Sequence, residues 1–220
     1  MIVIYGTRHY GVVDERGGEY ALTRFAHIYW LPLFPVGSMW VTRTTEDGYR
    51  GHTIGLSGKS VLAGYARVWG PIAAVAGVFT GGVGGFAVAG AAAGLSGWSW
   101  TWRKLRGARN ERRSHLNMLA FGTRCDPSRM SRELVEALMP EVEARWAEVA
   151  GGKTPSDVAR FGAENPAQAV AAYGLLRLRA RGGGGKASED EAMRILDQAH
   201  DVSALDDGGP YRSQLPDGAV

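Results

Sequence analysis

Residues 68–102 form an uncharged segment of 35 consecutive positions, and this feature limits the possible folds more than any other. A helix needs about 20 apolar residues to cross the hydrocarbon core of a bilayer, and this segment is longer. A core helix of a soluble protein is rarely uncharged for so long, because one face meets water. A flexible linker would carry Ser or charge instead of Ile, Val, Phe and Trp. We therefore expect a membrane segment, ahead of a soluble core helix or a low-complexity linker.

The residues that border this segment favour the same interpretation. Trp69 stands near its start, and Trp98, Trp100 and Trp102 stand at its end, as in the aromatic belts of membrane proteins. A basic collar follows directly, made of Arg103, Lys104, Arg106, Arg109, Arg112 and Arg113. Basic residues beside a membrane segment favour the cytoplasmic side and contact anionic headgroups. Nucleic acid is not an expected partner, because the collar lacks the stacking aromatic residues that usually accompany such binding.

The segment is long enough for one long helix or for two shorter ones. Residues 61–80 and 84–102 each have about the length of a span, with a turn at Gly81–Gly84. Lys59 and Arg67 precede the segment and the basic collar follows it, so both flanks are positive. A hairpin places both flanks on the same side, whereas a single span would export one of them. We therefore expect a hairpin in the bacterial inner membrane, with both termini cytoplasmic.

Small residues recur in this segment every fourth position, from Ala73 through Gly77, Gly81 and Gly85 to Gly97. Such spacing lines one face of a helix and allows close approach between helices, as in glycine-zipper segments. Chance in an Ala- and Gly-rich chain is the alternative. The residues predicted to pack against another helix are Gly77, Gly81, Gly85, Gly90 and Gly94.

Residues 1–58 are expected to form a small antiparallel β barrel or sandwich of about five strands. One hairpin is expected to turn at Asp14–Gly18, and another at Asp47–Gly48, which is a strong turn dipeptide. Pro32 and Pro35 argue against a regular central strand between them. The apolar run at 30–40 could lie at the bilayer interface, dock on the hairpin, or fill the β core.

Residues 5–41 carry a resemblance to known proteins. The Gly-Thr-Arg start, the Tyr-Gly pair, the Phe-Ala-His-Ile run and the Leu-Pro-Leu-Phe-Pro run resemble the opening of a group of uncharacterised bacterial membrane proteins. The LPLFPVG element is also similar to a segment of small zinc-ribbon membrane proteins. The resemblance implies a membrane architecture and no particular activity. The zinc-ribbon pattern itself is missing, because Cys125 is the single cysteine and thiolate ligation needs several.

No metal or cofactor is expected. His9, His27 and His52 could converge on a metal ion, but they lie on different expected strands, and isolated histidines are the more common case. The run GLSGKS at 55–60 imitates the end of a phosphate-binding loop, yet Thr53 occupies the position of its first glycine. No catalytic triad can be assigned, so we do not expect an enzyme.

Residues 105–202 are expected to form a helical domain. Leu134, Leu138, Val142 and Trp146 recur at helical spacing, and Pro140 is expected to kink or divide that helix. Helix starts are expected at Thr154, at Asn165 and, by the capping-box spacing of Ser188 and Glu191, at Ser188. The tail 203–220 is expected to be disordered.

The sequence therefore predicts an α+β membrane protein with three folded parts: a small antiparallel β domain (1–58), a glycine-rich transmembrane helical hairpin (59–104) and a C-terminal α-helical domain (105–202). The expected function is that of a non-catalytic scaffold or accessory subunit of a membrane complex, whose partners are the lipid bilayer and membrane proteins or itself. A pore-forming glycine-zipper oligomer is one alternative. A metal or small-ligand sensor that uses the β domain is the other.

Overall fold

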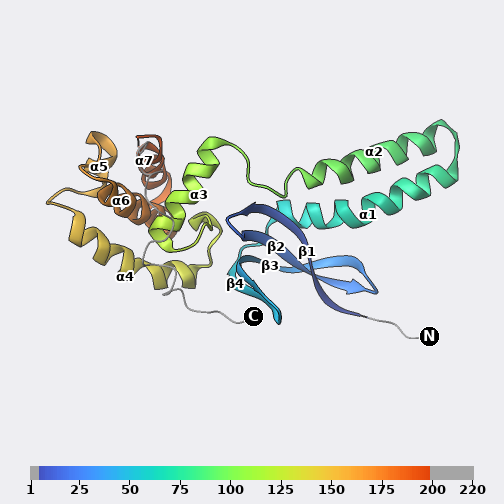
Figure 1. The fold of residues 1–220 in the computed structure, drawn as a ribbon, viewed down its shortest axis with the longest axis horizontal. Helices are drawn as coiled ribbons and strands as arrows, with labels where there is room; N and C mark the ends of the chain where they lie inside the picture. Colours follow the sequence, from blue (N-terminus) through green and yellow to red (C-terminus); the bar gives the residue numbers. More distant parts are fainter. Residues whose placement is uncertain (1–4, 199–220) are drawn as a thin grey trace. The chain divides into compact units, whose positions relative to one another are not determined.

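The chain has an α+β fold, with one antiparallel sheet near its N-terminus and helices over the rest (Figure 1). The computed structural model describes residues 5–198, so the predicted disordered tail 203–220 lies outside the described residues. The chain divides into two compact units, one that reaches to Arg106 and one that begins at Gly107. The sheet and the glycine-rich segment belong to the first unit.

Four strands form the sheet, in the order β1-β2-β3-β4, and every neighbouring pair is antiparallel. Residues 5–198 contain these four strands, one fewer than the sequence predicted. The rings of His9 on β1 and Tyr49 on β4 lie 5.1 Å apart, although two strands lie between them in the sheet. Flat strands would separate β1 from β4 by about 14 Å, so the sheet curls without closing into a barrel. The strands are β1 (Tyr5–Arg16), β2 (Glu19–Ile28), β3 (Leu31–Thr45) and β4 (Gly48–Ile54).

β3 corrects the expectation that Pro32 and Pro35 interrupt the sheet, since both prolines lie inside it. β4 pairs with β3 only from Ser38 onward, so the part of β3 that holds the prolines has a strand partner on one side alone. The β2–β3 register also shifts twice there, between Arg24 and Phe25 and between Ala26 and His27. An edge position with bulges tolerates proline, because no hydrogen bond to a second strand is required there.

Helix α1 (Gly58–Thr80) packs on one face of this sheet through its first three turns. Ser60, which is fully buried, donates a hydrogen bond of 2.6 Å to the Gly11 carbonyl oxygen and accepts one of 2.9 Å from Thr23. Gly11 has φ +72°, and a Cβ there would lie 1.9 Å from the backbone carbonyl oxygen of Ser60. Only glycine allows this approach, so Gly11 sets the distance between the helix and the sheet.

Helices α1 and α2 (Gly82–Trp100) form an antiparallel hairpin that continues beyond the sheet (Figure 1). Gly81, with φ +67°, is the residue that separates them, so the turn is shorter than the predicted Gly81–Gly84. After α2 the chain returns to the sheet edge. The amide of Asp14 bonds the Trp102 oxygen at 3.1 Å, and the amide of Glu15 bonds the Arg103 oxygen at 2.7 Å. Both ends of the hairpin are therefore fixed to the β domain.

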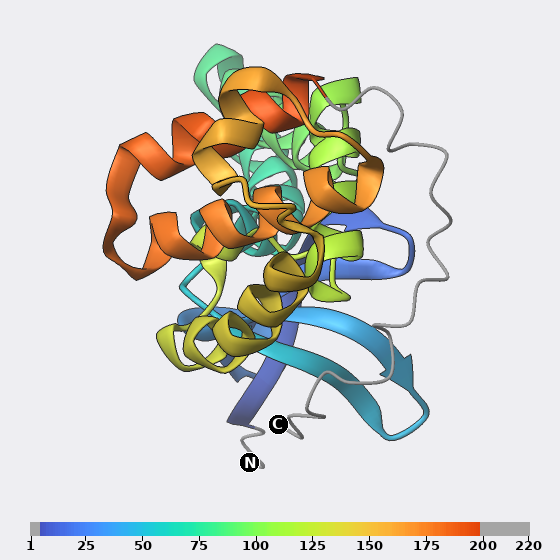
Figure 2. The ribbon, with the colours of Figure 1, turned by 90° about the vertical axis from the view of Figure 1, so that its left-hand side faces the viewer.

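The second unit is a helical bundle in which α6 packs against α3, α4, α5 and α7, as Figure 2 shows. Its most deeply buried large side chain, Tyr173, comes from α6. The elements are α3 (Ala108–Phe121), the 3₁₀ turn η1 (Pro127–Arg129), α4 (Arg132–Val149), α5 (Pro155–Phe161), α6 (Pro166–Arg179), the π turn η2 (Ala180–Gly184) and α7 (Gly185–Gln198).

Local signals located most of these helices. Thr154 and Asp157 form the predicted capping box of α5, and Asn165 caps α6 by accepting from the Gln168 amide. Pro140 neither divides nor ends α4, which runs through it. The start expected at Ser188 is wrong, because α7 begins at Gly185 and Ser188 lies inside its first turn. Helix α3 was not predicted as a separate helix. Its first half contains residues of the basic collar, and its buried apolar residues lie in the second half, which ends at Phe121.

Candidate functional site

The hairpin of α1 and α2 presents a large exposed apolar surface. Phe79 is 85% exposed and Val83 is 89% exposed, at the end of the hairpin farthest from the sheet. Neither helix carries a charged residue beyond Arg67. Soluble monomers rarely expose a contiguous apolar surface of this kind. The further exposed apolar side chains of this surface are Val75, Val78, Phe86, Val88 and Leu95.

Gly77 and Gly85 lie where the two helices meet. A Cβ on Gly77 would stand 2.7 Å from the Gly85 oxygen and 2.9 Å from the Ala89 nitrogen, and one on Gly85 would stand 2.5 Å from the Gly77 oxygen. These distances leave no room for a side chain, so the close packing of α1 on α2 depends on both glycines.

The other predicted packing glycines lie elsewhere. Gly81 forms the turn. A Cβ added to Gly90 or to Gly94 would meet nothing within 4 Å, so both glycines lie on the outer surface of α2. Any contact between these two glycines and another helix therefore involves a helix outside this hairpin. Gly70, which was not in the predicted set, does pack, because its Cβ would lie 2.8 Å from the Ser96 Cβ.

The tryptophans lie near the base of the hairpin, where it joins the sheet. The indole nitrogen of Trp69 donates to the Pro32 oxygen at 3.0 Å. Trp98 and Trp102 pack edge to face, with centroids 4.8 Å apart. The Arg67 guanidinium lies 4.7 Å from the centre of the Trp100 ring. An amphipathic aromatic belt at this level is the arrangement expected of a membrane border.

Arg67 joins three segments at this base, and sequence reasoning did not assign it that role. Its guanidinium donates to the Val12 oxygen of β1 and to the Ser99 oxygen of α2, both at 2.7 Å. The cation thus bridges the sheet and both helices. The only sequence signal was a single charge inside an apolar run, and that signal does not reveal its partners.

The residues of the basic collar are divided between the two units. Arg103, Lys104 and Arg106 belong to the first unit, whereas Arg109, Arg112 and Arg113 lie on α3 in the second. Arg103 pairs with Glu15 at 2.8 Å, Arg109 pairs with Asp197 at 3.0 Å, and Arg113 lies 3.6 Å from Asp126. At least half of the collar is therefore paired with carboxylates of its own unit, which reduces the charge available to lipid headgroups.

The histidines do not suggest a metal centre. No group of three or more His, Cys, Asp or Glu side chains within residues 5–198 is arranged to hold a metal ion. His9 lines an open hollow of about 430 Å³ on the sheet face away from α1, together with Arg24, Tyr49, Arg50 and others. Burial and the nearby Arg24 lower the pKa of His9, which disfavours its protonation.

The residues of the GLSGKS run have structural roles. Ser57 caps α1, and Lys59 forms an ion pair with the buried Asp14. Ser60 joins the helix to the sheet through its bonds with Gly11 and Thr23. The Lys59 ammonium and the Ser60 hydroxyl, which in a phosphate-binding loop would contact the ligand, are thus bonded to other residues of the first unit.

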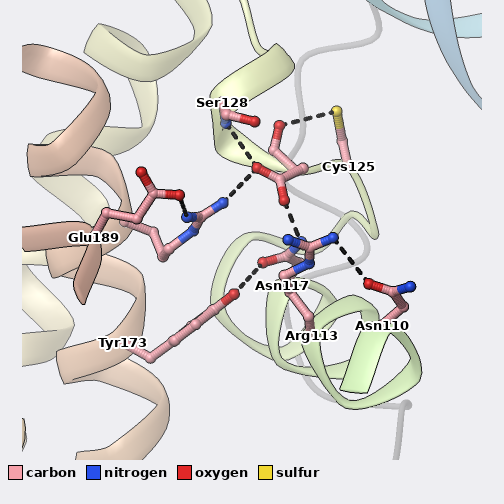
Figure 3. Close-up of polar contacts among 9 residues, drawn as sticks. Asn110, Arg113, Asn117, Cys125, Ser128, Tyr173 and Glu189 are labelled. Atoms are coloured by element: carbon pink, nitrogen blue, oxygen red, sulfur yellow. Dashed lines mark hydrogen bonds and ion pairs between the residues drawn. The ribbon is translucent and has the colours of Figure 1, made fainter. Parts of the chain in front are cut away.

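A buried polar network lies in the second unit (Figure 3). Arg177 is 3% exposed and bonds both Asp126 and Glu189, the latter at 3.1 Å. Burial opposes ionisation of Asp126, but Arg177, two hydrogen bonds with Ser128 and the charge of Arg113 outweigh burial and lower its pKa. Tyr173 donates to Asn117 at 2.9 Å, and burial raises the pKa of its phenol. The network connects α3, η1, α6 and α7, which is a structural role.

No protein-family model matches this chain, and neither a curated protein nor a solved structure is similar enough to it to indicate a relationship. The resemblance to bacterial membrane proteins carried by residues 5–41 therefore stays a prediction. The exposed apolar surface of the hairpin is the feature of the described residues that bears most directly on function.

Proposed function

We propose that this protein is a non-catalytic integral membrane protein of the bacterial inner membrane, anchored by the α1–α2 hairpin. Its β domain and helical unit, both on the cytoplasmic side, would serve as a scaffold or accessory subunit of a membrane complex. The observation that carries the proposal is the uncharged, exposed apolar surface of the hairpin, bordered by tryptophans.

Hydropathy supports the proposal only in part. Among the described helices, α1 is long and apolar enough to cross a membrane by length and composition, and 28% of its most apolar window is buried. Low burial distinguishes α1 from the core helix of a soluble domain. α2 contains Gly at many positions and does not reach the same hydropathy. The prediction of two membrane-crossing helices is therefore not confirmed.

Membrane insertion can be tested with the full chain and liposomes. We expect the protein to float with the vesicles and to stay bound after an alkaline carbonate wash. The double substitution Phe79→Lys and Val83→Lys should abolish this resistance, because each buried cation is expensive in hydrocarbon. Phe161→Lys is the matched control, since Phe161 is also exposed but lies in the second unit. A wild-type chain that stays monomeric in buffer without vesicles would contradict the proposal.

The pore alternative is supported by the open faces of Gly90 and Gly94, which leave room for a helix of a second copy. A pore requires a closed ring of identical subunits. The mass of the protein in detergent therefore distinguishes the two functions. A monomer or a complex with other proteins favours the scaffold, and a uniform homo-oligomeric ring favours the pore.

A further inference from the structure

The tip of the β2–β3 hairpin is a second exposed apolar surface in the first unit. Trp30 is 55% exposed and Phe34 is 70% exposed, and residues 28–36 contain no charged residue. Tyr5, which pairs with Ile28 across β1 and β2, extends the surface at the same end of the sheet. The other exposed apolar residues of this β tip are Ile28, Tyr29 and Val36.

The β tip is attached to helix α1 at a defined level. The Tyr65 hydroxyl donates to the Leu33 oxygen at 2.6 Å, and the Trp69 indole donates to the Pro32 oxygen at 3.0 Å. Both acceptors belong to the part of β3 that pairs with β2 but extends beyond the pairing with β4. Side chains of α1 therefore bond backbone carbonyl groups of this part of β3. The β tip and the Trp69 turn of α1 therefore lie side by side.

Beyond this attachment the hairpin is short. Gly70–Thr80 is the part of α1 past Trp69, and its eleven residues correspond to about 16 Å of helix. The hydrocarbon core of a bilayer is about 30 Å thick. If the β tip rests at the membrane surface, the Phe79–Val83 end reaches about the middle of the bilayer and does not cross it.

Charges at the base agree with this placement. From Pro71 to Thr101 both helices are uncharged, whereas Arg67, Arg103 and Lys104 lie at the end of the hairpin that joins the sheet. Lys104 and Arg103 are exposed there. Exposed cations at the level of the aromatic residues complement the anionic headgroups of a cytoplasmic leaflet, and the pairing of Arg103 with Glu15 offsets only part of this charge.

We propose that the β2–β3 tip is a second membrane-contact element, which rests among the lipid headgroups and restricts the α1–α2 hairpin to a single leaflet. This inference rests on the proposed membrane anchoring and specifies its depth. The ligand is one leaflet of a bilayer with anionic headgroups. The length of the apolar segment predicted two membrane-spanning helices. In the structure, however, the first three turns of α1 pack on the sheet, so they are not available to cross the membrane.

Fluorescence quenching in liposomes tests the proposal on the full chain. Three single-cysteine variants in a Cys125→Ala background carry a bimane label: Phe79→Cys at the hairpin end, Phe34→Cys at the β tip, and Asp47→Cys in the exposed β3–β4 turn as the control. All three positions are exposed, so substitution disturbs little packing. The vesicles contain phosphatidylglycerol and a nitroxide either on the headgroup or at the end of the acyl chain.

We expect the label at position 79 to be quenched mainly by the acyl-chain nitroxide, the label at position 34 mainly by the headgroup nitroxide, and the label at position 47 by neither. An impermeant thiol reagent should fail to reach the unlabelled cysteine at position 79 from either side of the vesicle.

Three results would overturn the inference in distinguishable ways. Modification of the cysteine at position 79 by reagent enclosed in the vesicle shows a full crossing, which refutes the single-leaflet insertion but leaves membrane anchoring intact. Quenching at position 34 no stronger than at position 47 shows that the β tip does not contact lipid. A folded protein with no quenching at any of the three positions contradicts the proposed function itself.

Discussion

Arg177 is a buried cation, and its surroundings explain why the second unit tolerates it. Asp126 and Glu189 both bond its guanidinium, and Asp126 is in turn held by the Ser128 amide at 2.9 Å. Removing one partner of such a pair leaves a buried charge without compensation, which usually costs about 3–5 kcal/mol. The network therefore stabilises one arrangement of α3, α6 and α7.

Asp126→Asn should destabilise the second unit strongly at pH 7 and much less in acid. The folded-state pKa of Asp126 lies below its ordinary value, so its contribution is present above about pH 4 and is lost as the pH falls through the lowered pKa. Urea unfolding followed by circular dichroism at pH 7 and at pH 3 measures the difference. Asp197→Asn is the control, because Asp197 pairs with Arg109 at an exposed site. An equal loss at both pH values would show that the carboxylate charge is not what matters.

Gly77→Leu should open the α1–α2 hairpin, because its Cβ would meet the backbone of Gly85 and Ala89. Overpacking of this kind typically costs about 1–3 kcal/mol. Unfolding in detergent by increasing the fraction of sodium dodecyl sulfate measures the loss. Gly90→Leu is the matched control, since nothing lies within 4 Å of its Cβ position. Equal effects of the two substitutions would mean that helix propensity, not close packing, dominates.

At the scale of helices and strands, the contacts that attach the α1–α2 hairpin to the β domain determine how the hairpin is oriented. Ser60, Tyr65, Arg67 and Trp69 follow one another along α1, and each bonds the sheet. Their partners, Gly11, Leu33, Val12 and Pro32, come from two strands. A helix held at four successive levels cannot tilt freely, so the angle at which the hairpin leaves the sheet is defined by polar contacts.

Trp69→Phe should loosen this attachment while leaving the hairpin intact. It removes the 3.0 Å bond to the Pro32 oxygen, and a net protein hydrogen bond is worth about 1 kcal/mol. Amide hydrogen exchange along β3 and the first turns of α1 should rise severalfold in the variant. Trp98→Phe retains an aromatic ring at an exposed position and serves as the control. If hydrogen exchange in Trp69→Phe is unchanged, the bond between Trp69 and Pro32 does not hold the β tip against α1.

For the chain as a whole, dependence on a membrane should reside in the first unit alone. A fragment that begins at Gly107 contains the bundle with its buried side chains Leu116, Tyr173, Leu175 and Ile195. We expect this fragment to be soluble and helical in buffer and to unfold cooperatively in urea. A fragment that ends at Arg106 should need detergent or lipid to remain soluble. A second unit that aggregates without detergent would contradict this division.

Features that depend on neighbours in the sequence were predictable. The uncharged segment, the glycine between α1 and α2, and the caps at Thr154 and Asn165 follow from composition and local hydrogen bonding. The sequence indicated an α+β chain with a helical hairpin for the same reason. Each of these properties depends on residues a few positions apart in the sequence. Such residues are close together whenever the local helix forms, whatever the rest of the fold is.

Features that depend on distant residues required the folded chain. Pro32 and Pro35 fit into β3 because β4 ends before reaching them, which no local signal shows. Gly77 packs and Gly90 does not, although both belong to repeats of the same spacing. Arg109 is paired with Asp197, which lies far along the chain, and Arg67 bridges β1 and α2. The energy of a buried contact or an ion pair depends on which surfaces meet, and tertiary packing brings those surfaces together.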